Sequence, residues 1–499
     1  MYNSPFDSCN SFTRRAALRF LGVAAAGQMA LGHRSSAWAA LSNSSSTGED
    51  SALIANAQPS PSGTIVTGTM QVTNTKIGVI PQNYLGLGYE KSAINTPCFT
   101  GTNKNLIQLM KWLGPGLLHL GGNTADALTW VASGSGGVSG QVSPPDITRL
   151  GAFLAATGWK VIYTINLARS SPSLAADEAS SVADILGSGL FSVELGNEPD
   201  LYSNHISGYS GFTFSDYVAQ WKEFYNAVHT KVPSVKFTGP GTAGNANTWT
   251  IPFSQSVGSD IEAIGQHYYR GDSLASTSTI EQLVSPDARL QTELGGLAAA
   301  AAKIGKSFRI TETNSYYNQG PSGVQNAYGS ALWLIDHLFN LSKLGCISVC
   351  VEGGQENRYT PIEDNHGTVI DIRPEYYGLR MFATAGKGDL VQTTLSVGSM
   401  NVTGYAIHNY GTKYGLMFVN KDPFQNISMT VTCPQQISSA NLVALEGASL
   451  SALSGQTVQS ANIGINGVMA LNTPNGLSFS GNKLTCYVNA KSAALVRIS

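Results

Sequence analysis

Residues 160–196 read KVIYTINLARSSPSLAADEASSVADILGSGLFSVELG. A β-branched apolar run opens this stretch and another closes it, and the segment between them has the composition of a helix. A strand, a helix and a second strand in this order predict a βα unit of a parallel sheet. The same alternation continues along the chain on both sides of this unit.

Short apolar runs recur between about residues 76 and 355. We count eight, at 84–88, 116–121, 160–167, 190–196, 235–239, 261–268, 307–312 and 345–352. Helices are expected between them at 106–112, 145–157, 176–187, 215–231, 286–304 and 324–344. This α/β pattern predicts a (β/α)8 TIM barrel over 76–383. A doubly wound open sheet is the alternative, but no G-x-G-x-x-G turn follows an early run.

The texture of the sequence changes after Arg380. Short runs such as Tyr414-Gly-Leu-Met-Phe-Val and Lys483-Leu-Thr-Cys-Tyr-Val alternate polar and apolar residues and are separated by Gly, Asn, Ser and Pro. This spacing indicates a C-terminal antiparallel β-sandwich domain over 384–499. The strand-like segment 63–75 lies before the barrel and is expected to join that sandwich.

The N-terminus has the parts of an export signal. Arg14 and Arg15 precede an Ala/Leu/Gly/Val run, and Ala37-Trp-Ala39 fits a cleavage site. Residues 1–39 therefore predict a signal peptide of the twin-arginine type, and 40–62 a Ser/Pro-rich linker. We expect a periplasmic or secreted bacterial protein. No later stretch reaches 18 uninterrupted apolar residues, so no membrane association is expected after cleavage.

Composition narrows the function. The 499 residues carry 29 Lys+Arg against 31 Asp+Glu, a formal net charge of −2, which argues against nucleic acid as a partner. Six cysteines are too few for a disulfide scaffold in a chain of this length. Cys346 and Cys350 stand four residues apart in one expected strand, too far to bond each other. We interpret them as small buried apolar residues.

Active sites of such barrels lie at the carboxyl ends of the strands. The fourth run ends in Glu194-Leu-Gly-Asn197-Glu198-Pro199-Asp200 and the seventh in Arg309-Ile-Thr-Glu312. Two carboxylates that face each other across the barrel mouth are what cleavage of a glycosidic bond requires. Glu194 competes with Glu198, but it lies four residues earlier and therefore deeper in the strand.

The motifs together resemble glycoside hydrolase family 79 of clan A, which includes β-glucuronidases and heparanase-like enzymes. The resemblance covers the whole mature chain. It rests on the order barrel then sandwich and on Gly-Leu-Gly-Tyr-Glu90, Leu-Gly-Gly-Asn123, Asn197-Glu198-Pro199, Gln-His-Tyr268-Tyr and Ile-Thr-Glu312. It implies a retaining mechanism with Glu198 as acid/base and Glu312 as nucleophile.

The resemblance also implies sugar-binding residues. Asn197 matches an asparagine that hydrogen-bonds the sugar 2-OH, and Tyr268 a tyrosine that donates to the nucleophile. Tyr317 and Tyr359 fit tyrosines that hold the substrate carboxylate. The candidates for the 3- and 4-hydroxyls are Glu90, Asn123 and Asp126. Strict strand alternation would place Asn197 and Glu198 on opposite faces, so both reach the site only if the strand ends or bulges there.

The expected function is an exo-acting retaining β-glucuronidase that releases glucuronic acid from oligo- or polysaccharides. Another clan A activity, such as a β-glucosidase, a β-xylosidase or an endo-acting heparanase-like hydrolase, is the alternative within enzymes. A non-catalytic glycan-binding protein is the alternative from another class. His119 and His267 do not have the spacing of a zinc motif, and no metal or other cofactor is expected. The oligomeric state stays open.

Overall fold

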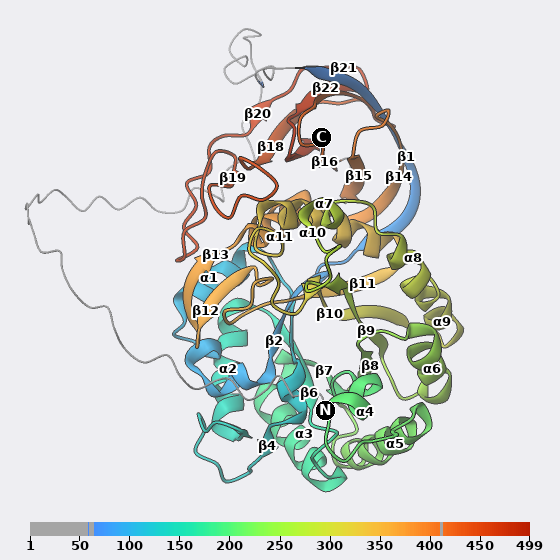
Figure 1. Ribbon diagram of the computed structural model, residues 1–499, viewed down its shortest axis with the longest axis vertical. Coiled ribbons are helices and arrows are strands. Elements are labelled where there is room, and N and C mark those ends of the chain that lie inside the picture. The colour runs from blue at the N-terminus through green and yellow to red at the C-terminus, as the bar shows by residue number, and fades with distance from the viewer. Residues whose placement is uncertain (1–57, 59–63, 410–412) are drawn as a thin grey trace, which may run out of the picture. The chain divides into compact units, whose positions relative to one another are not determined.

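The computed structural model describes residues 58, 64–409 and 413–499 (Figure 1). The predicted signal peptide and most of the predicted linker lie outside the described residues. Within them, the chain forms an eight-stranded parallel sheet, an 11-stranded mixed sheet and two short two-stranded sheets.

The eight-stranded sheet is a barrel. Its strands are β2 (Leu85–Glu90), β3 (Leu117–Gly121), β6 (Lys160–Ile165), β7 (Leu190–Leu195), β8 (Thr238–Thr242), β9 (Ala263–Asp272), β10 (Ser307–Tyr317) and β11 (Cys346–Glu352). They pair in the order β7-β6-β3-β2-β11-β10-β9-β8. A parallel bridge between Val193 and Phe237 joins the two edge strands and closes the ring. The eight predicted runs thus correspond to the eight barrel strands.

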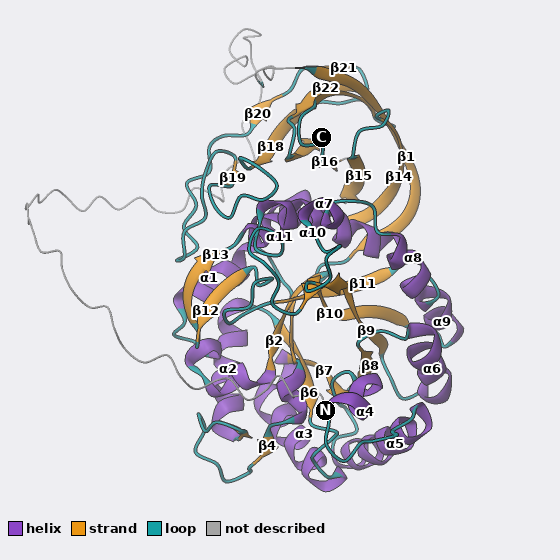
Figure 2. Ribbon diagram, in the orientation of Figure 1, coloured by secondary structure: helices purple, strands orange, loops and turns teal. Residues whose placement is uncertain are grey.

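Helices surround these strands, as Figure 2 shows. They are α1 (Lys104–Trp112), α2 (Pro144–Thr157), α3 (Pro172–Leu186), α4 (Tyr202–His205), α5 (Phe214–Lys231), α6 (Ile251–Val257), α7 (Ile280–Leu283), α8 (Ala288–Leu294), α9 (Leu297–Lys303), α10 (Tyr328–Lys343) and α11 (Pro374–Ala385). Their starts carry clear signals: Ser171 caps α3 before Pro172, and Thr213 forms a capping box with Asp216 at α5.

Two predicted elements differ from the structure. The single helix expected over 286–304 is two helices, because Gly295 and Gly296 interrupt it and glycine disfavours the helical interior. The fifth barrel strand begins at Thr238, three residues later than the run that predicted it. Its sequence TGPGT has poor strand propensity, so the pairing with β9 decides its conformation.

The second sheet is mixed. It contains β1 (Ile65–Ile80), β14 (Gly388–Ser396), β15 (Val402–Asn409), β16 (Lys413–Asn420), β17 (Asn426–Thr432), β18 (Ala440–Glu446), β19 (Thr457–Val458), β20 (Asn475–Gly476), β21 (Phe479–Ser480), β22 (Lys483–Val488) and β23 (Ser492–Ile498). The N-terminal β1 pairs antiparallel with β14 and parallel with β17. The expectation of a purely antiparallel sandwich is therefore wrong in this one pairing, because β1 enters the sheet from the other end of the chain.

The small sheets are β4 (Thr129–Trp130) with β5 (Gln141–Val142), and β12 (Ile362–Asn365) with β13 (Thr368–Ile372). One apolar core extends from the barrel helices to the C-terminal sheet, where Phe339 of α10 stacks on Tyr405 of β15. A second core lies within the C-terminal sheet around Met429 and Phe418. The shared core fixes the barrel on this sheet through α10 and α11.

The cysteine prediction is confirmed for the residues that the structure describes. Cys98, Cys346, Cys350, Cys433 and Cys486 are all buried and free. Burial raises the pKa of the Cys346 thiol to about 12, so it stays a neutral apolar group. None of the described helices is both long and apolar enough to cross a bilayer.

Candidate active site

Glu198 lies in the first turn after β7. The strand ends at Leu195, and Gly196 then adopts a φ of +81° and Glu198 a φ of +49°. The left-handed conformation costs roughly 1–3 kcal/mol for a residue with a side chain. Because the strand has ended, its alternation no longer applies, and Asn197 and Glu198 can both belong to the site. The Glu198 side chain is 17% exposed.

Glu312 lies within β10, five residues before that strand ends. The register with β9 slips at Thr311, because Ile310 pairs with Gln266 while Glu312 pairs with His267. This bulge directs two consecutive side chains into the barrel. Thr311 reaches Glu194 at 3.5 Å, and the Glu312 carboxylate reaches His267 at 3.7 Å. Glu312 is 7% exposed.

His267 of β9 joins the two carboxylates. Its Nδ1 lies 3.0 Å from Oε1 of Glu198 and 3.7 Å from Oε2 of Glu312. One oxygen of each carboxylate lies within 4.8 Å of the other. Retaining glycosidases have carboxyl separations of ~5–5.5 Å, whereas inverting enzymes have ~6.5–9.5 Å. The geometry therefore favours direct attack by a carboxylate over attack by an intervening water.

His267 and Glu312 are expected to carry opposite charges. Burial acts to lower the pKa of His267, but Glu312 and Glu198 outweigh it and raise this pKa to about 9, so the imidazole is a cation at neutral pH. Burial also raises the pKa of Glu312, and Glu198 adds to this effect. The charge of His267 acts in the opposite direction and favours the ionised Glu312 that a nucleophile needs.

The prediction that Tyr268 donates to the nucleophile is wrong. Tyr269 donates its hydroxyl to Oε1 of Glu312 at 2.8 Å. Tyr268 lies on the other face of β9, where its hydroxyl bonds Asp287 at 2.8 Å and its ring stacks on His337 of α10. Strand alternation explains the difference, because His267 points into the barrel and the residue two positions later must share its face.

We expect Tyr269→Phe to lower kcat/KM by about 10- to 100-fold, the value of a hydrogen bond to a charged group. The Tyr269 hydroxyl favours the ionised form of Glu312 and so lowers its pKa. Its removal raises that pKa and moves the acidic limb of the pH profile to higher pH. The matched control is Tyr268→Phe, which loses a bond to Asp287 outside the barrel. An acidic limb that moves in the control and not in Tyr269→Phe would contradict this assignment.

Asp126 does not fit the role of a sugar ligand that the sequence predicted. Its Oδ1 accepts from the backbone N–H groups of Leu167 and Ala168, and its Oδ2 from the N–H of Asn197 and the hydroxyl of Tyr202. These donors satisfy both oxygens, and the residue is buried. Asp126 is therefore a positioning residue for Asn197. The amide oxygen of Asn197 is buried and has no partner, so it is available to a ligand.

Glu90 and Asn123 lie together at the ends of β2 and β3. Glu90 accepts from the N–H groups of Asn123 and Thr124 and from the hydroxyl of Thr124. Gly122 makes this contact possible, because its φ is +68° and a Cβ there would lie 2.5–2.8 Å from the Glu90 carboxyl atoms. The Asn123 side chain is exposed. The predicted contacts of these two residues with sugar hydroxyls stay predictions.

Tyr317 and Tyr359 lie on either side of Tyr269. Both rings meet it edge-on, with centroid distances of 6.2 and 6.1 Å. The loops that follow β10 and β11 are tied together, since Gln319 bonds the side chain of Asn357 and the N–H of Arg358. Tyr317 is 46% exposed, whereas Tyr359 is half-buried. The structure therefore brings both predicted tyrosines to Tyr269, which donates to Glu312, and their contact with a substrate stays a prediction.

Three residues of the site were missed: His267, Tyr269 and Glu352. From the sequence, His267 was set aside as a zinc ligand, and Tyr269 stands one position from the residue selected. Glu352 ends β11, so the strand-end rule that selected Glu312 also selects it. Glu194 lies deeper, paired with His119 at 2.8 Å, and this position agrees with its rejection as the acid.

Three overlapping sets of side chains have ligand atoms close enough together to bind one metal ion. They are His119/Glu194/His267, His119/Glu312/Glu352 and Glu198/His267/Glu312. In the third set, His267 already forms a hydrogen bond with Glu198. The positive charge on His267 opposes the binding of a metal cation there. The expectation of a metal-independent site stays a prediction.

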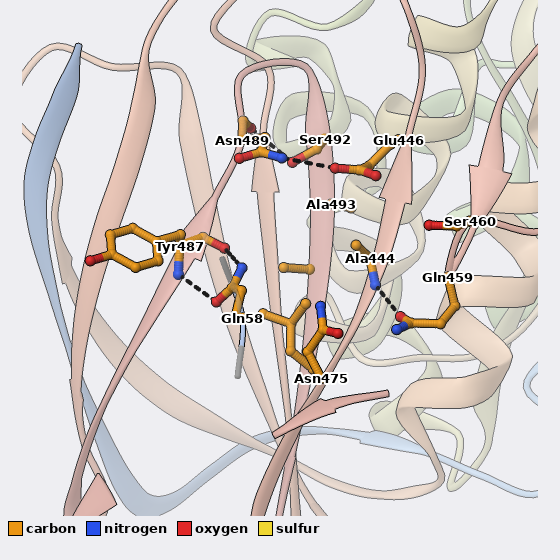
Figure 3. A pocket seen from close by; sticks show the side chains of 12 residues that line it. Gln58, Ala444, Glu446, Gln459, Ser460, Asn475, Tyr487, Asn489, Ser492 and Ala493 are labelled. Atoms are coloured by element: carbon orange, nitrogen blue, oxygen red, sulfur yellow. Dashed lines mark hydrogen bonds between the residues drawn. The ribbon is translucent and has the colours of Figure 1, made fainter. Parts of the chain in front are cut away.

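A polar pocket lies on the C-terminal sheet, and residues of the barrel do not line it (Figure 3). Several of its polar side chains already have hydrogen-bond partners within the pocket. Asn489 donates to Glu446, Gln459 accepts from the N–H of Ala444, and Gln58 forms two bonds with the backbone of Tyr487. We therefore place the candidate active site in the barrel.

A closed parallel barrel that brings two carboxylates close together is an architecture of glycoside hydrolases. The chain is similar in sequence to a β-glucuronidase of Aspergillus niger, with 24% identity over 312 residues, 56% of this chain and 57% of that protein. It is also similar to a β-glucuronidase of Neurospora crassa, with 26% identity over 308 residues, 52% of this chain and 54% of that protein. The chain thus spans about half the length of these curated relatives. No protein-family model matches it.

Solved structures agree on the fold. A 4-O-α-L-rhamnosyl-β-D-glucuronidase of Fusarium oxysporum 12S, in complex with Rha-GlcA, has a TM-score of 0.72 and 20% identity, covering 86% of this chain and 99% of that one. An α-L-arabinofuranosidase of Thermotoga maritima has a TM-score of 0.65 and 14% identity, covering 87% and 99%. These likenesses show that the chain has the fold of barrel glycosidases.

Proposed function

We propose that the chain is a retaining, exo-acting β-glucuronidase of the kind found in glycoside hydrolase family 79. The single observation that carries this proposal is the His267-bridged pair Glu198 and Glu312, whose closest oxygens lie within 4.8 Å. Both fungal relatives are named β-glucuronidases, and this supports glucuronate as the sugar that is released. The substrate is a glucuronate-containing oligo- or polysaccharide. The paired arginines at the N-terminus support export to the periplasm or the medium.

The reaction is a double displacement. Glu312 attacks the anomeric carbon while Glu198 protonates the leaving oxygen, so the glycosidic bond breaks as the glycosyl–Glu312 ester forms. Glu198 then takes a proton from water, which attacks the same carbon and releases glucuronate and free Glu312. The imidazolium of His267 contacts both carboxylates and can stabilise their negative charge as it shifts between them.

The sugar carboxylate is assigned to Tyr317 and Tyr359, which form a tyrosine cluster with Tyr269, while the Tyr269 hydroxyl itself is donated to Glu312. Hydroxyl groups donate to a carboxylate without a cation, which suits a site with several carboxylates of its own. Burial raises the pKa of Tyr359 far above its usual value, so this hydroxyl keeps its proton and stays a donor. Asn197 is assigned to the sugar 2-OH, through its unpartnered amide oxygen.

The test compares aryl β-glucuronide with aryl β-glucoside. The wild type is expected to prefer the glucuronide, and Tyr359→Phe to lower kcat/KM for it by about 10- to 100-fold, the value of a hydrogen bond to a charged group. The glucoside rate should change much less. Tyr487→Phe, on the C-terminal sheet, is the matched control. Preference for another sugar would identify a different clan A activity, and binding without turnover a glycan-binding protein.

A further inference from the structure

Glu352 is a carboxyl group of the site that the proposed reaction does not use. It pairs with Gly88 of β2, and Gly88 pairs in turn with His119 of β3, so the three residues form one row across neighbouring strands. Because Gly88 has no side chain, the Glu352 carboxyl lies over it: a Cβ on Gly88 would be 2.0 Å from Oε2 of Glu352. One Glu352 oxygen lies within 4.8 Å of Glu312 and of His119.

No cation compensates this group. Glu352 is 3% exposed, its Oε2 has no hydrogen-bond partner, and among the described residues no lysine or arginine forms an ion pair with it. Its ionisable neighbours are Tyr89 and Glu90 of β2, His119 of β3, Glu198 after β7, Tyr269 of β9, Glu312 of β10, Cys350 of β11 and Tyr359 of the following loop.

A carboxyl group in these surroundings favours its neutral form. Burial raises the pKa of Glu352 well above its usual range, and the charges of Glu312, Glu90 and Glu198 raise it further. A neutral carboxylic acid has an O–H donor, and a buried donor requires an acceptor. Among the described residues, the unpartnered Oε2 of Glu312 is a nearby acceptor when no sugar is bound.

Glu352 also lies beside the tyrosine cluster. The side-chain amide of Asn314 binds the backbone carbonyls of both Glu352 and Tyr359, at 2.7 and 2.9 Å. This one donor group fixes the end of β11 against the loop that carries Tyr359. The Glu352 carboxyl is also an electrostatic neighbour of the Tyr359 and Tyr269 hydroxyls. A sugar carboxylate held by Tyr359 and Tyr317 would therefore lie near the Glu352 side chain.

Resting on the β-glucuronidase function proposed above, we propose that Glu352 determines specificity as a neutral carboxylic acid that donates a hydrogen bond to the sugar carboxylate. Ionisation removes that donor and places a like charge against the bound anion. Binding of an anionic sugar then requires the proton on Glu352, and binding of a neutral sugar does not.

The first measurement is the dissociation constant of D-glucuronate across the range of pH in which the protein is folded, by calorimetry. Above the pKa of Glu352 the constant is expected to rise about tenfold per pH unit, as linkage to one proton requires. Glu352→Gln keeps a neutral donor of similar shape, and this rise should be absent in it. Glu356→Gln makes the same change on an exposed residue four positions later and should behave as the wild type.

The second measurement needs no substrate. The infrared difference spectrum between wild type and Glu352→Gln at neutral pH should contain the C=O band of a protonated carboxyl group. A carboxylate band in its place, or glucuronate affinity with the same pH dependence in wild type and Glu352→Gln, overturns the proposal. If aryl glucuronides are turned over nevertheless, the proposed function stands without it. Absence of glucuronide turnover overturns the proposed function, and the infrared spectrum still decides the protonation of Glu352.

Discussion

Glu312→Ala should lower kcat for an aryl β-glucuronide by about 10⁴-fold or more, as removal of a covalent nucleophile does in other enzymes. No other described carboxylate can replace it without rearrangement. Glu198 has the acid/base role in the proposed reaction, Glu194 is paired with His119 in the barrel interior, and Glu352 is held over Gly88. The measurement is steady-state hydrolysis, with Glu281→Gln on the exposed surface of α7 as control.

Product stereochemistry makes this prediction sharper. In Glu312→Ala, azide can occupy the space that the carboxylate leaves and attack the anomeric carbon from that face. Such an attack inverts the configuration and gives an α-glycosyl azide. Near-wild-type hydrolysis by Glu312→Ala, or rescue by azide with retention of configuration, would show that Glu312 is not the nucleophile.

Glu198→Ala should lose about 10²- to 10⁴-fold in kcat/KM for a substrate with a poor leaving group, the usual contribution of a general acid. A substrate with an activated leaving group needs little protonation, so its first step should be nearly preserved. The glycosyl–Glu312 ester then accumulates, because no base activates water. Azide needs no base and should restore turnover, giving a β-glycosyl azide with retained configuration.

The pair of variants therefore predicts opposite azide products from two residues whose oxygens lie within 4.8 Å. The fast first step should appear as an initial burst of released leaving group from the activated substrate. If Glu198→Ala gives neither this burst nor rescue by azide, Glu198 is not the acid/base. Glu194→Gln is a poor control here because Glu194 supports His119, so Glu281→Gln on the exposed surface of α7 is used again.

Local patterns were sufficient to predict the barrel. Each of the eight apolar runs is one barrel strand, since a buried parallel strand must be apolar on both faces and is bounded by polar turns. The exceptions have local causes. TGPGT becomes a strand only because β9 pairs with it, and the Gly295-Gly296 pair divides a segment whose alanine-rich composition suggested one helix.

The candidate site was predicted in part. Glu198 and Glu312 were predicted from the rule that catalytic groups lie at the carboxyl ends of barrel strands. Glu198 does follow β7, but Glu312 lies five residues before β10 ends, and the bulge at Thr311 directs it into the barrel. The choice of Tyr268 was wrong by one position because the face of β9 was taken from a resemblance, and only the structure shows that His267, and therefore Tyr269, faces into the barrel. Asp126 lies at the end of the 3-10 helix Asn123–Asp126 that follows β3, and its four donors come from Leu167, Ala168, Asn197 and Tyr202, which only the fold brings together.

By itself, the sequence determined the eight strands, the change to a β-rich C-terminal region and the two glutamates, because these depend on periodicity and on position along a strand. The tertiary structure decided the charges of the site. The cation on His267 and the unpartnered carboxyl of Glu352 arise from side chains of β2, β3, β9, β10 and β11 that meet in the barrel interior. Electrostatic energy depends on distance and burial in space, and neither can be read from spacing along the chain.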